Sequence, residues 1–369
     1  MKHVFFIAGE SSGDMHGANL IRALRLADPT IRCAGLGGRR MAEAGMELIH
    51  DLAGDAIMGF VEVLKRVLPL RRLFLDTVAQ LQKNPPDCLV LIDYPGFNIR
   101  LARAAYDLGI PIVYYISPQV WAWKKKRIDV LARLVRKMLV IFPFEEALYR
   151  DKGVDCVYVG HPLVDELATY QPPPFDEKML TIGLLPGSRE QEIRRIAPVM
   201  RAVAEGIRDT HPDARFMIPC VSESRAEQVR AIMNPLDVEI RVGGMYEVLS
   251  RARCCLVASG TATVETTLFG VPMGIVYRVN PISYYLARLI VHVRHIGMVN
   301  ILAEREVAPE FIQGDATVKR ILPFMLDIIE DGERRDRMLT DLREIKKRFG
   351  ASGASQRAAE QILQVLNKD

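Results

Sequence analysis

Short apolar runs rich in valine, isoleucine and leucine alternate with helical patterns from the first residues of the chain onward. This alternation predicts parallel β-sheets whose strands are joined by crossover helices. In the first half we expect strands at 4–8, 31–36, 47–50, 88–92, 111–116, 137–142 and 155–159. Between them, the periodicity predicts helices at 17–27, 57–82, 98–108, 124–135 and 144–152.

The alternation is interrupted at 168–178, which contains three consecutive prolines. Such a run cannot continue a helix or a central strand, so we expect a domain linker there. A second series follows, with strands near 180–185, 214–219, 237–242, 254–258 and 272–276 and helices at 281–294, 315–330, 333–348 and 354–367. The predicted fold is α/β, with two Rossmann-like domains at 1–170 and 179–350 that face each other across a ligand-binding cleft.

Composition and charge narrow the class of protein. Lys and Arg total 49 against 45 for Asp and Glu, a formal net charge of +4. So small an excess gives no reason to expect a nucleic-acid partner. It does allow local basic patches, which favour anionic substrates or an anionic lipid surface.

The cysteines and the N-terminal residues indicate in which compartment of the cell we expect the protein. The six cysteines fall mostly in apolar, strand-like runs and show no Cys-x-x-Cys spacing. They are typical of buried free thiols in a reducing compartment and not of disulfides or a zinc site. Residues 1–3 lead directly into the first predicted strand, so we expect no signal peptide. No uncharged apolar run is long enough for a membrane span, and we therefore expect a cytoplasmic protein.

A strand, a turn of small residues and a helix start succeed one another at 254–272. Free N–H groups and the positive end of the helix dipole make such a turn an anion site, here formed by Ser259, Gly260 and Thr261. We place Glu265 in the first helical turn, where it can accept hydrogen bonds from sugar hydroxyls. The alternative is that Glu265 only complements the dipole, which contributes about 0.3–1 kcal/mol.

A second turn of this kind occurs at 186–192. Ser188 and Gln191 have the spacing of a capping box, which explains both residues structurally. The capping box leaves Arg189 unexplained, and Arg189 is a permanently charged donor beside Gly187 and a helix start. Two such anion sites in one domain match the two phosphate groups of a diphosphate.

In the first half, the loop Gly9–Gly17 follows the first strand but lacks the G-x-G-x-x-G spacing of a dinucleotide site. Its glycines allow close backbone approach to a ligand, and both Glu10 and Ser12 can face the cleft. An ordinary strand-to-helix turn is the alternative. His16 can act as a base, but a lone histidine beside a glycine is more often packed in a loop.

Asp93 directly follows an apolar strand, 88–92, that we expect to be central and buried on both faces. A carboxylate there is costly unless it is hydrogen-bonded or used in chemistry. The alternative is a helix cap, but Asn98 is closer to the predicted helix start, so we favour a function. Both tryptophans, Trp121 and Trp123, occur in one loop before a run of four basic residues, which is typical of either a binding surface or a buried core.

Five motifs in this order resemble those of the lipid-A-disaccharide synthase family. They are Gly-Glu-Ser-Ser-Gly-Asp at 9–14, Asp-Tyr-Pro-Gly-Phe-Asn at 93–98, Ser-Pro-Gln-Val-Trp-Ala-Trp at 117–123, Pro-Gly-Ser-Arg at 186–189 and Ser-Gly-Thr-Ala-Thr-Val-Glu at 259–265. The second and third are much more specific than a general nucleotide motif. One position departs: Met298-Val299-Asn300 stands where the family has Leu-Pro-Asn, which retains Asn300 as a candidate substrate-binding residue.

The resemblance implies a GT-B glycosyltransferase fold and the condensation of UDP-2,3-diacylglucosamine with 2,3-diacylglucosamine 1-phosphate (lipid X). The products would be the β-1′,6-linked disaccharide 1-phosphate of lipid A biosynthesis and UDP. Enzymes of this fold typically hold the diphosphate without a metal, so we expect neither metal nor cofactor. Inversion at the sugar calls for one base that deprotonates the acceptor hydroxyl, and Asp93 and Glu10 are the candidates.

Two other functions stay open at this stage. One is another UDP-sugar enzyme on the same fold, such as a UDP-N-acetylglucosamine 2-epimerase, which would need no acyl-chain site. The other is a non-catalytic nucleotide-binding protein at the membrane surface. Such a protein could keep Arg189 and Glu265 but would have no reason to place Asp93 at a strand end.

The segment 60–75 mixes bulky apolar residues with four basic ones and contains Pro69, which we expect to interrupt the helix. A packed crossover helix is one explanation. The lipid substrates favour a second, a peripheral anchor on the cytoplasmic surface of the inner membrane. The candidate membrane and acyl-chain residues are Val63, Leu64, Val67, Leu70, Trp121 and Trp123.

The last helices have no strand left to cross over, so their apolar stripes must be buried elsewhere. In GT-B folds the final helix commonly returns to the first domain, and relatives of this family can exchange C-terminal elements between subunits. We therefore expect residues 351–369 to pack on an N-terminal domain, in the same chain or in the partner of a homodimer.

Overall fold

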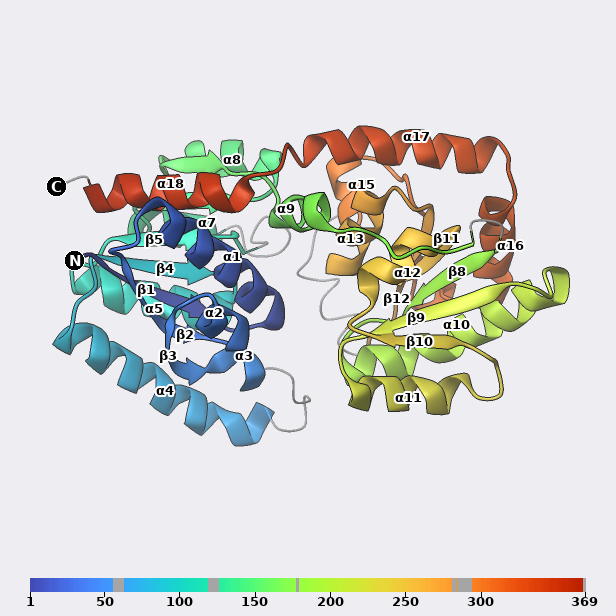
Figure 1. Ribbon diagram of the computed structural model, residues 1–369, viewed down its shortest axis with the longest axis horizontal. Coiled ribbons are helices and arrows are strands. Elements are labelled where there is room, and N and C mark those ends of the chain that lie inside the picture. Colours follow the sequence, from blue (N-terminus) through green and yellow to red (C-terminus); the bar gives the residue numbers. More distant parts are fainter. Residues whose placement is uncertain (56–62, 119–125, 177–178, 281–283, 285–293, 368–369) are drawn as a thin grey trace. The chain divides into compact units, whose positions relative to one another are not determined.

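The computed structural model describes the chain except residues 56–62, 119–125, 177–178, 281–283, 285–293 and 368–369 (Figure 1). The chain forms two compact units. Unit 1 comprises Met1–Ala168 and Phe349–Asp369, and unit 2 comprises Thr169–Arg348. Each unit contains one parallel sheet with helices. The predicted α/β class is therefore confirmed.

Unit 1 contains a seven-stranded parallel sheet with the order β3-β2-β1-β4-β5-β6-β7. The strands are β1 (His3–Ala8), β2 (Arg32–Gly37), β3 (Glu47–Asp51), β4 (Cys88–Ile92), β5 (Ile112–Tyr115), β6 (Lys137–Val140) and β7 (Cys156–Tyr158). The helices are α1 (Ser11–Ala27), α2 (Arg39–Glu43), α3 (Leu52–Asp55), α4 (Val63–Lys83), α5 (Pro95–Asp107), α7 (Lys126–Leu134), α8 (Pro143–Arg150), α9 (Pro162–Thr169) and α18 (Ala354–Asn367).

The core of unit 1 explains why its strands are apolar without alternation. Every residue of β4, β5 and β6 is buried, because helices cover both faces of the sheet. β4 is the fourth of the seven strands and lies between β1 and β5. The sequence after β4 therefore begins at the middle of the sheet edge.

Unit 2 contains a six-stranded parallel sheet with the order β10-β9-β8-β11-β12-β13. The strands are β8 (Thr181–Leu185), β9 (Arg215–Cys220), β10 (Glu239–Val242), β11 (Cys254–Ala258), β12 (Met273–Tyr277) and β13 (Glu310–Ile312). The helices are α10 (Glu190–Thr210), α11 (Glu223–Met233), α12 (Met245–Arg251), α13 (Thr261–Phe269), α15 (Met298–Ala303), α16 (Val318–Ile329) and α17 (Glu333–Arg348). The short edge strand β13 is absent from the sequence prediction.

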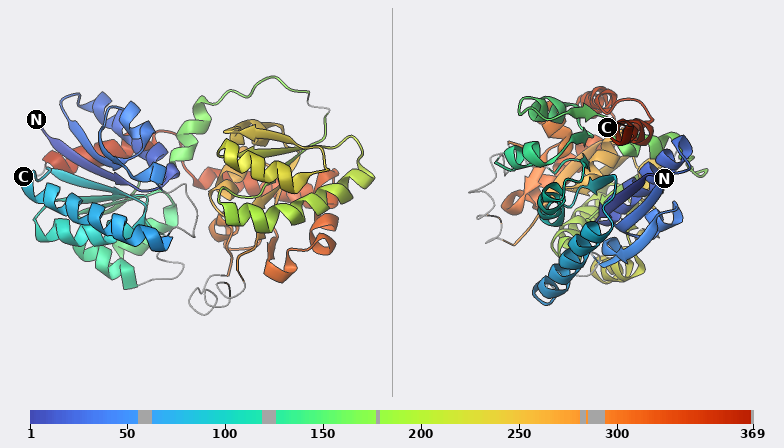
Figure 2. Two further views of the ribbon diagram at one scale, coloured as in Figure 1. Left: turned by 90° about the horizontal axis from the view of Figure 1, so that it is seen from below. Right: turned by 90° about the vertical axis from the view of Figure 1, so that its left-hand side faces the viewer.

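The C-terminal helix α18 belongs to unit 1, where it packs along α1 of the same chain (Figures 1 and 2). Its N-terminus is held by Asp165, whose carboxylate accepts the backbone N–H groups of Gly353 (2.5 Å), Ala354 (3.1 Å) and Ser355 (3.0 Å). Further along, Lys137 donates to Gln361 Oε1 at 3.0 Å. A capped start and a buried apolar stripe together fix this helix on unit 1.

Two predicted helix starts and one predicted helix interruption are wrong. α1 begins at Ser11 and not at residue 17, so most of the predicted Gly9–Gly17 loop is helical. α5 begins at Pro95, because proline suits the first turn of a helix, where its missing N–H needs no partner. Pro69 lies inside α4 and does not end it. None of the described helices is long and apolar enough to cross a membrane.

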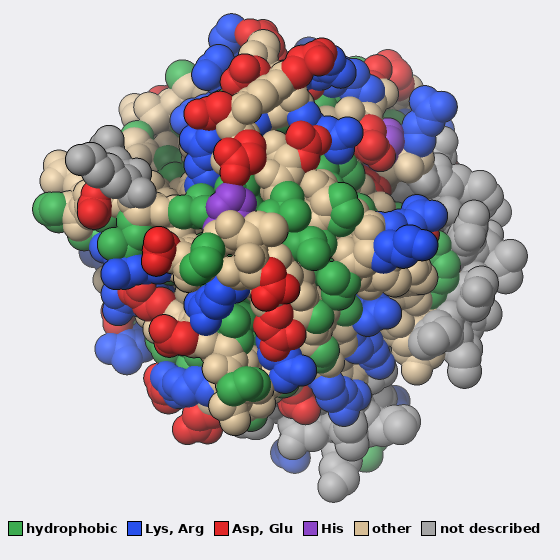
Figure 3. Space-filling model, turned by 90° about the vertical axis from the view of Figure 1, so that its right-hand side faces the viewer, with side chains coloured by type: hydrophobic (Ala, Val, Ile, Leu, Met, Phe, Trp, Pro, Cys, Tyr) green, Lys and Arg blue, Asp and Glu red, His purple; other side chains and the backbone are tan. Residues whose placement is uncertain are grey.

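On the face of the molecule shown in Figure 3, basic and acidic side chains are interspersed. Many ion pairs of unit 2 join such neighbours, for example Arg334 to Asp327 at 2.8 Å and Arg230 to Glu223 at 2.7 Å. Exposed pairs of this kind contribute little to stability.

Candidate active site

In unit 1 the two loops singled out from the sequence start side by side. β1 and β4 are parallel neighbours, and their last residues, Ala8 and Ile92, are register partners. The chain therefore leaves both strands at one edge of the sheet, with Gly9 and Asp93 as the next residues. Ligands of such sheets bind at this carboxyl edge.

The chain reverses sharply at Asp93 and Tyr94, which have the left-handed φ angles of 45° and 46°. The turn is made by these two residues, and Pro95 and Gly96 after them are the first residues of α5. The Tyr94 ring packs directly on Gly9. A Cβ added to Gly9 would lie 2.2 Å from that ring, so only glycine permits the contact.

The Asp93 carboxyl group has an unusual electrostatic environment. Burial and, to a smaller extent, the negative charge of Glu10 raise its pKa to about 7, and a hydrogen bond from the backbone of Tyr94 opposes the rise. Among the described residues, no side chain donates a hydrogen bond to this carboxylate. Asp93 therefore exchanges its proton close to neutral pH, as a general base should.

Glu10 occupies the N-cap position of α1 and has extended backbone angles. Its carbonyl oxygen accepts the N–H of Asp14 at 2.9 Å, and its side chain is partly exposed. Ser12 lies in the first turn of α1 and not in a loop. Both residues thus lie at the edge from which Asp93 emerges.

The other polar residues of this segment are structural. The buried Asp14 carboxylate accepts the backbone N–H groups of Gly38 (2.9 Å), Arg40 (3.1 Å) and Met41 (3.0 Å), which caps α2. His16 is also buried. Burial, with a smaller contribution from Arg40, lowers the pKa of His16 to about 4, so the imidazole is neutral. His16 is therefore a packed residue and not a base poised near neutral pH.

In unit 2 the two predicted anion sites also follow neighbouring strands. β8 and β11 are the two central strands of that sheet, and Leu185 is paired with Val257 near their ends. The turn after β8 contains Gly187, with a φ of 102°, and the turn after β11 contains Gly260, with a φ of 154°. Both turns lead into helices, α10 and α13, so two helix starts meet at one edge.

The turn before α10 is organised by Glu192. Its Oε2 accepts the N–H groups of Ser188 and Arg189, each at 3.2 Å, and its Oε1 pairs with Arg189 Nη1 at 3.0 Å. The predicted capping box of Ser188 and Gln191 is therefore wrong by one residue, and its partners are Arg189 and Glu192. The Arg189 side chain is 73% exposed. Its guanidinium has further N–H groups with which to reach a ligand.

The turn before α13 has no side-chain cap, which leaves the N–H groups of Gly260 and Thr261 open to a ligand, whereas the N–H of Ser259 donates to Val276 O at 3.0 Å. Thr263 and Thr266 use their hydroxyls inside the helix, since they donate to Gly260 O at 2.8 Å and Ala262 O at 2.7 Å. Thr261 is the first helical residue. Glu265 lies in the second turn of the helix and not, as predicted, in the first.

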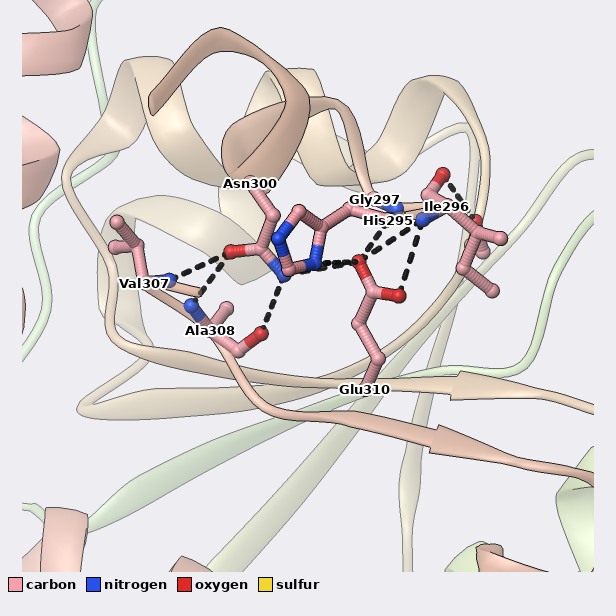
Figure 4. Close-up of polar contacts among 8 residues, drawn as sticks. His295, Ile296, Gly297, Asn300, Val307, Ala308 and Glu310 are labelled. Carbon is pink, nitrogen blue, oxygen red and sulfur yellow. Dashed lines mark hydrogen bonds and ion pairs between the residues drawn. The ribbon is translucent and has the colours of Figure 1, made fainter. Parts of the chain in front are cut away.

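Asn300 belongs to a hydrogen-bonded cluster centred on Glu310 (Figure 4), and Ser259 is joined to this cluster through the 295–297 turn. Ser259 Oγ donates to Ile296 O at 3.1 Å. On the other side of that turn, the Glu310 carboxylate accepts the N–H groups of Ile296 (3.0 Å) and Gly297 (2.9 Å). Glu310, which sequence reasoning missed, thus holds the 295–297 turn against the turn after β11.

Asn300 is fully buried, and its amide is saturated within the protein. Nδ2 donates to Ala308 O at 2.7 Å and Glu310 Oε1 at 2.9 Å, and Oδ1 accepts the N–H groups of Val307 (2.7 Å) and Ala308 (2.9 Å). An asparagine amide has no further donor to offer. The predicted direct contact of Asn300 with substrate is therefore replaced by a structural role.

The remaining candidates are only partly visible. Trp121 and Trp123 lie outside the described residues, as do the side chains of Val63, Leu64 and Val67. Leu70 is described and is 37% exposed. No group of three or more metal-binding side chains occurs among the residues that the structure describes.

Comparison with known proteins decides the family. Residues 4–365 match the family described as Lipid-A-disaccharide synthetase. The chain belongs to this family. It is 39% identical to the lipid-A-disaccharide synthase of Geobacter sulfurreducens, over 99% of this chain and 97% of that protein. It is 40% identical to that of Syntrophus aciditrophicus, over 100% and 98%. The chain is accordingly a hexosyltransferase of lipid A biosynthesis.

Solved structures show the same fold at much lower identity. A putative UDP-N-acetylglucosamine 2-epimerase from Listeria monocytogenes has a TM-score of 0.67 at 12% identity, over 100% of this chain and 98% of that chain. The calicheamicin glycosyltransferase CalG4 has a TM-score of 0.64 at 16% identity, over 99% and 98%. The predicted GT-B fold is confirmed. The epimerase considered from the sequence is a relative in fold alone.

The raised pKa of Asp93 predicts a specific pH dependence of stability. The pKa of this carboxyl is 3.8 in the unfolded chain and about 7 in the folded protein. Its contribution to the free energy of unfolding is therefore fully present below about pH 4 and is lost as the pH rises through 7. The loss amounts to roughly 4 kcal/mol at most. Between pH 4 and pH 8, the free energy of unfolding of Asp93→Asn should therefore rise relative to wild type, as measured by urea titration.

Asp76→Asn, at an exposed position on α4, is the control and should track wild type across this range. A difference between Asp93→Asn and wild type that does not change with pH would show that Asp93 titrates as an ordinary carboxyl.

Proposed function

We propose that unit 2 binds the UDP-sugar and that unit 1 supplies the base that activates lipid X. The observation that carries this division is the Asp93 carboxyl, which is partly buried at the end of the central strand of unit 1 and has a pKa of about 7. The paired helix starts in unit 2 supply the complementary anion site. The reaction yields the disaccharide 1-phosphate and UDP.

On the donor side, the diphosphate lies at the turns formed by 187–190 and 259–263. The backbone N–H groups of Gly260 and Thr261 bind one phosphate beside Ser259, whose own N–H donates to Val276 O at 3.0 Å. Gly187, Ser188 and Arg189 bind the other phosphate. The partly exposed Glu265 accepts hydrogen bonds from the ribose. Arg189 and the two helix dipoles stabilise the charge that develops on UDP as it leaves.

On the acceptor side, Asp93 removes the proton from the 6-hydroxyl of lipid X while that oxygen attacks the donor sugar. A base with a pKa near neutral is ionised in the cell yet still accepts a proton readily. Glu10 keeps the pKa of Asp93 high through its negative charge and is the alternative base. Ser12, in the first turn of α1, binds the acceptor.

The direct test is product formation. Purified protein incubated with UDP-2,3-diacylglucosamine and lipid X should yield the disaccharide 1-phosphate by mass spectrometry. UDP release should require both lipids. Release of UDP without lipid X, or no disaccharide with both lipids present, would reject the proposed reaction.

Arg189→Ala should weaken UDP binding by about 1.5–3 kcal/mol, because it removes a charged hydrogen bond to the diphosphate. Isothermal titration calorimetry with UDP measures the effect. Arg194→Ala, at an exposed position one turn further along α10, is the matched control and should bind as wild type does. Unchanged UDP affinity in Arg189→Ala would remove Arg189 from the diphosphate site.

Asp93→Asn should lower kcat by roughly 10²- to 10⁴-fold, because asparagine keeps the shape but cannot accept the proton. UDP affinity should not change. In wild type, kcat should fall as the pH drops below about 7, where Asp93 becomes protonated. If Asp93→Asn keeps near-normal turnover and Glu10→Gln does not, the base is Glu10.

We also propose that unit 1 contacts the cytoplasmic surface of the inner membrane through α4. One face of α4 packs on the core through Phe74, Val78 and Leu81. Away from this face, Leu68 is 72% exposed and Leu75 is 55% exposed. Exposed Arg71 and Arg72 flank them, as interfacial helices require. By sequence alone, the further candidates for acyl-chain contact are Trp121, Trp123, Val63, Leu64 and Val67, whose side chains lie outside the described part of the chain. We also propose that the protein forms a homodimer.

Replacing Leu68, Leu70 and Leu75 with serine should release the protein from vesicles that contain anionic lipid, as measured by co-sedimentation. Because these side chains are exposed, the thermal midpoint should change little. Leu26→Ser is the control, since Leu26 is 88% exposed on α1. Equal sedimentation of the triple variant and wild type would show that α4 is not a membrane anchor.

A further inference from the structure

The backbone around Asp93 is held in a conformation that it would not adopt alone. Asp93 and Tyr94 are consecutive non-glycine residues with φ angles of 45° and 46°. Side chains make this left-handed region unfavourable, and such residues persist only where their surroundings impose it. Something must therefore hold this turn in place.

Two buried side chains converge on the carbonyl oxygen of Asp93. Tyr114 Oη donates to it at 2.6 Å, and Asn98 Nδ2 donates to it at 2.7 Å. Asn98 Nδ2 also donates to Ile92 O at 3.2 Å. At the other end of the residue, the N–H of Asp93 donates to Tyr115 O at 3.1 Å. Asp93 is thus restrained on both sides of its Cα, from which its carboxylate extends.

The fold delivers these two donors from different elements. Tyr114 lies on β5, where it is the register partner of Leu91 in the neighbouring β4. Asn98 lies in α5, and its own N–H donates to Tyr94 O at 3.0 Å. Both side chains are completely buried, so water cannot replace either donor. Burial and the nearby charge of Asp93 also keep the pKa of Tyr114 high, so its hydroxyl retains the proton that it donates.

We infer that Tyr114 and Asn98 are positioning residues for catalysis: their hydrogen bonds to the Asp93 carbonyl hold the left-handed turn that aims the Asp93 carboxylate at the acceptor. This inference rests on the proposed role of Asp93 as the base. It assigns function to two residues that do not themselves touch the substrate. A displacement of the base by about 1 Å is enough to lower turnover substantially.

A purely structural role for the two residues predicts a different outcome. If they only stabilised the start of α5, their loss would lower the melting temperature without changing the kinetics of the folded enzyme. If they position the base, kcat falls while the KM for UDP-sugar, which binds to unit 2, stays the same. The pH profile of kcat separates the two roles further, because it reports the environment of the carboxylate itself.

The charged groups that act on Asp93 are few among the described residues. Glu10 faces it from the start of α1, and the Tyr114 hydroxyl faces it from β5. Arg127 on α7 acts on the Tyr114 hydroxyl. Relaxation of the turn would bring the carboxylate towards solvent and away from Glu10. The pKa of Asp93 would then fall towards its ordinary value, and the acid limb of the profile would move to lower pH.

The test compares Tyr114→Phe with Tyr115→Phe. Both remove one buried hydroxyl from β5, but side chains of neighbouring strand residues point to opposite faces, and only that of Tyr114 bonds to Asp93. Tyr114→Phe should lower kcat by roughly 10- to 100-fold, with an unchanged KM for UDP-sugar and an acid limb below the wild-type midpoint. Tyr115→Phe should behave as wild type.

Asn98→Ala provides a second, independent variant and should give the same pattern. Wild-type kcat and pH midpoint in Tyr114→Phe would overturn the inference, as would a lower kcat without any shift of the acid limb. Asp93→Asn, assayed in parallel, separates a failure of the positioning inference from a failure of the proposed role of Asp93 as the base. If Asp93→Asn is inactive while Tyr114→Phe is normal, the positioning inference fails alone. If Asp93→Asn is fully active, the proposed base is wrong, and the inference falls with it.

Discussion

The partial burial of the Asp93 carboxylate at the end of β4 is the constraint on which the site in unit 1 depends. Removing a carboxylate from water is unfavourable, and this cost is the reason its pKa lies near 7. The position follows from topology, because β4 is the middle strand of a parallel sheet with both faces covered. Gly9 completes the arrangement by admitting the Tyr94 ring beside the neighbouring loop. The core that stabilises unit 1 thus also creates its chemistry.

The other carboxylates that organise turns in this protein are treated in the opposite way. Asp14, Asp165, Glu192 and Glu310 each accept two or more backbone N–H groups at a turn or helix start. Such bonds satisfy backbone donors that the helix itself cannot. Asp93 instead keeps its carboxylate nearly without donors, while its carbonyl oxygen receives two. This contrast supports the proposed role of Asp93 as the base.

The strands could be predicted because buried parallel strands are continuous apolar runs, as 88–92 and 254–258 show. The helix starts were predicted wrongly where a local sequence pattern is compatible with two structures. The glycines of Gly9–Gly17 suggested a loop, yet α1 begins at Ser11. Ser188 and Gln191 matched a capping box, yet Glu192, one residue further on, takes that place. β13 was missed because three residues at a sheet edge carry too little periodicity.

The sequence predicted the site residues that follow the strand ends. It did not predict the residues that hold them in place by hydrogen bonds. Asp93 stands out in the sequence as an acid after an apolar run, and its role as base stays a prediction. Tyr114 has no such signal, because a tyrosine in an apolar strand is typical of any core. The partners of Asn300 are mostly backbone groups near Val307, which no side-chain pattern reveals. Contacts of this kind depend on the tertiary fold, so the sequence alone could suggest that Asn300 matters but not how.

The distant relatives in fold show where the chemistry of this chain must reside. A structure 12% identical to it has the same two-sheet framework, with a TM-score of 0.67. Apolar strands and crossover helices are sufficient to specify that framework, and they leave the reaction unspecified. The difference between one UDP-sugar enzyme and another must then lie in the few residues that leave the strands at their carboxyl ends. In unit 1 the residue that leaves the central strand is Asp93. The elements around it, from Gly9 to Tyr114, determine the environment in which that carboxyl exchanges its proton.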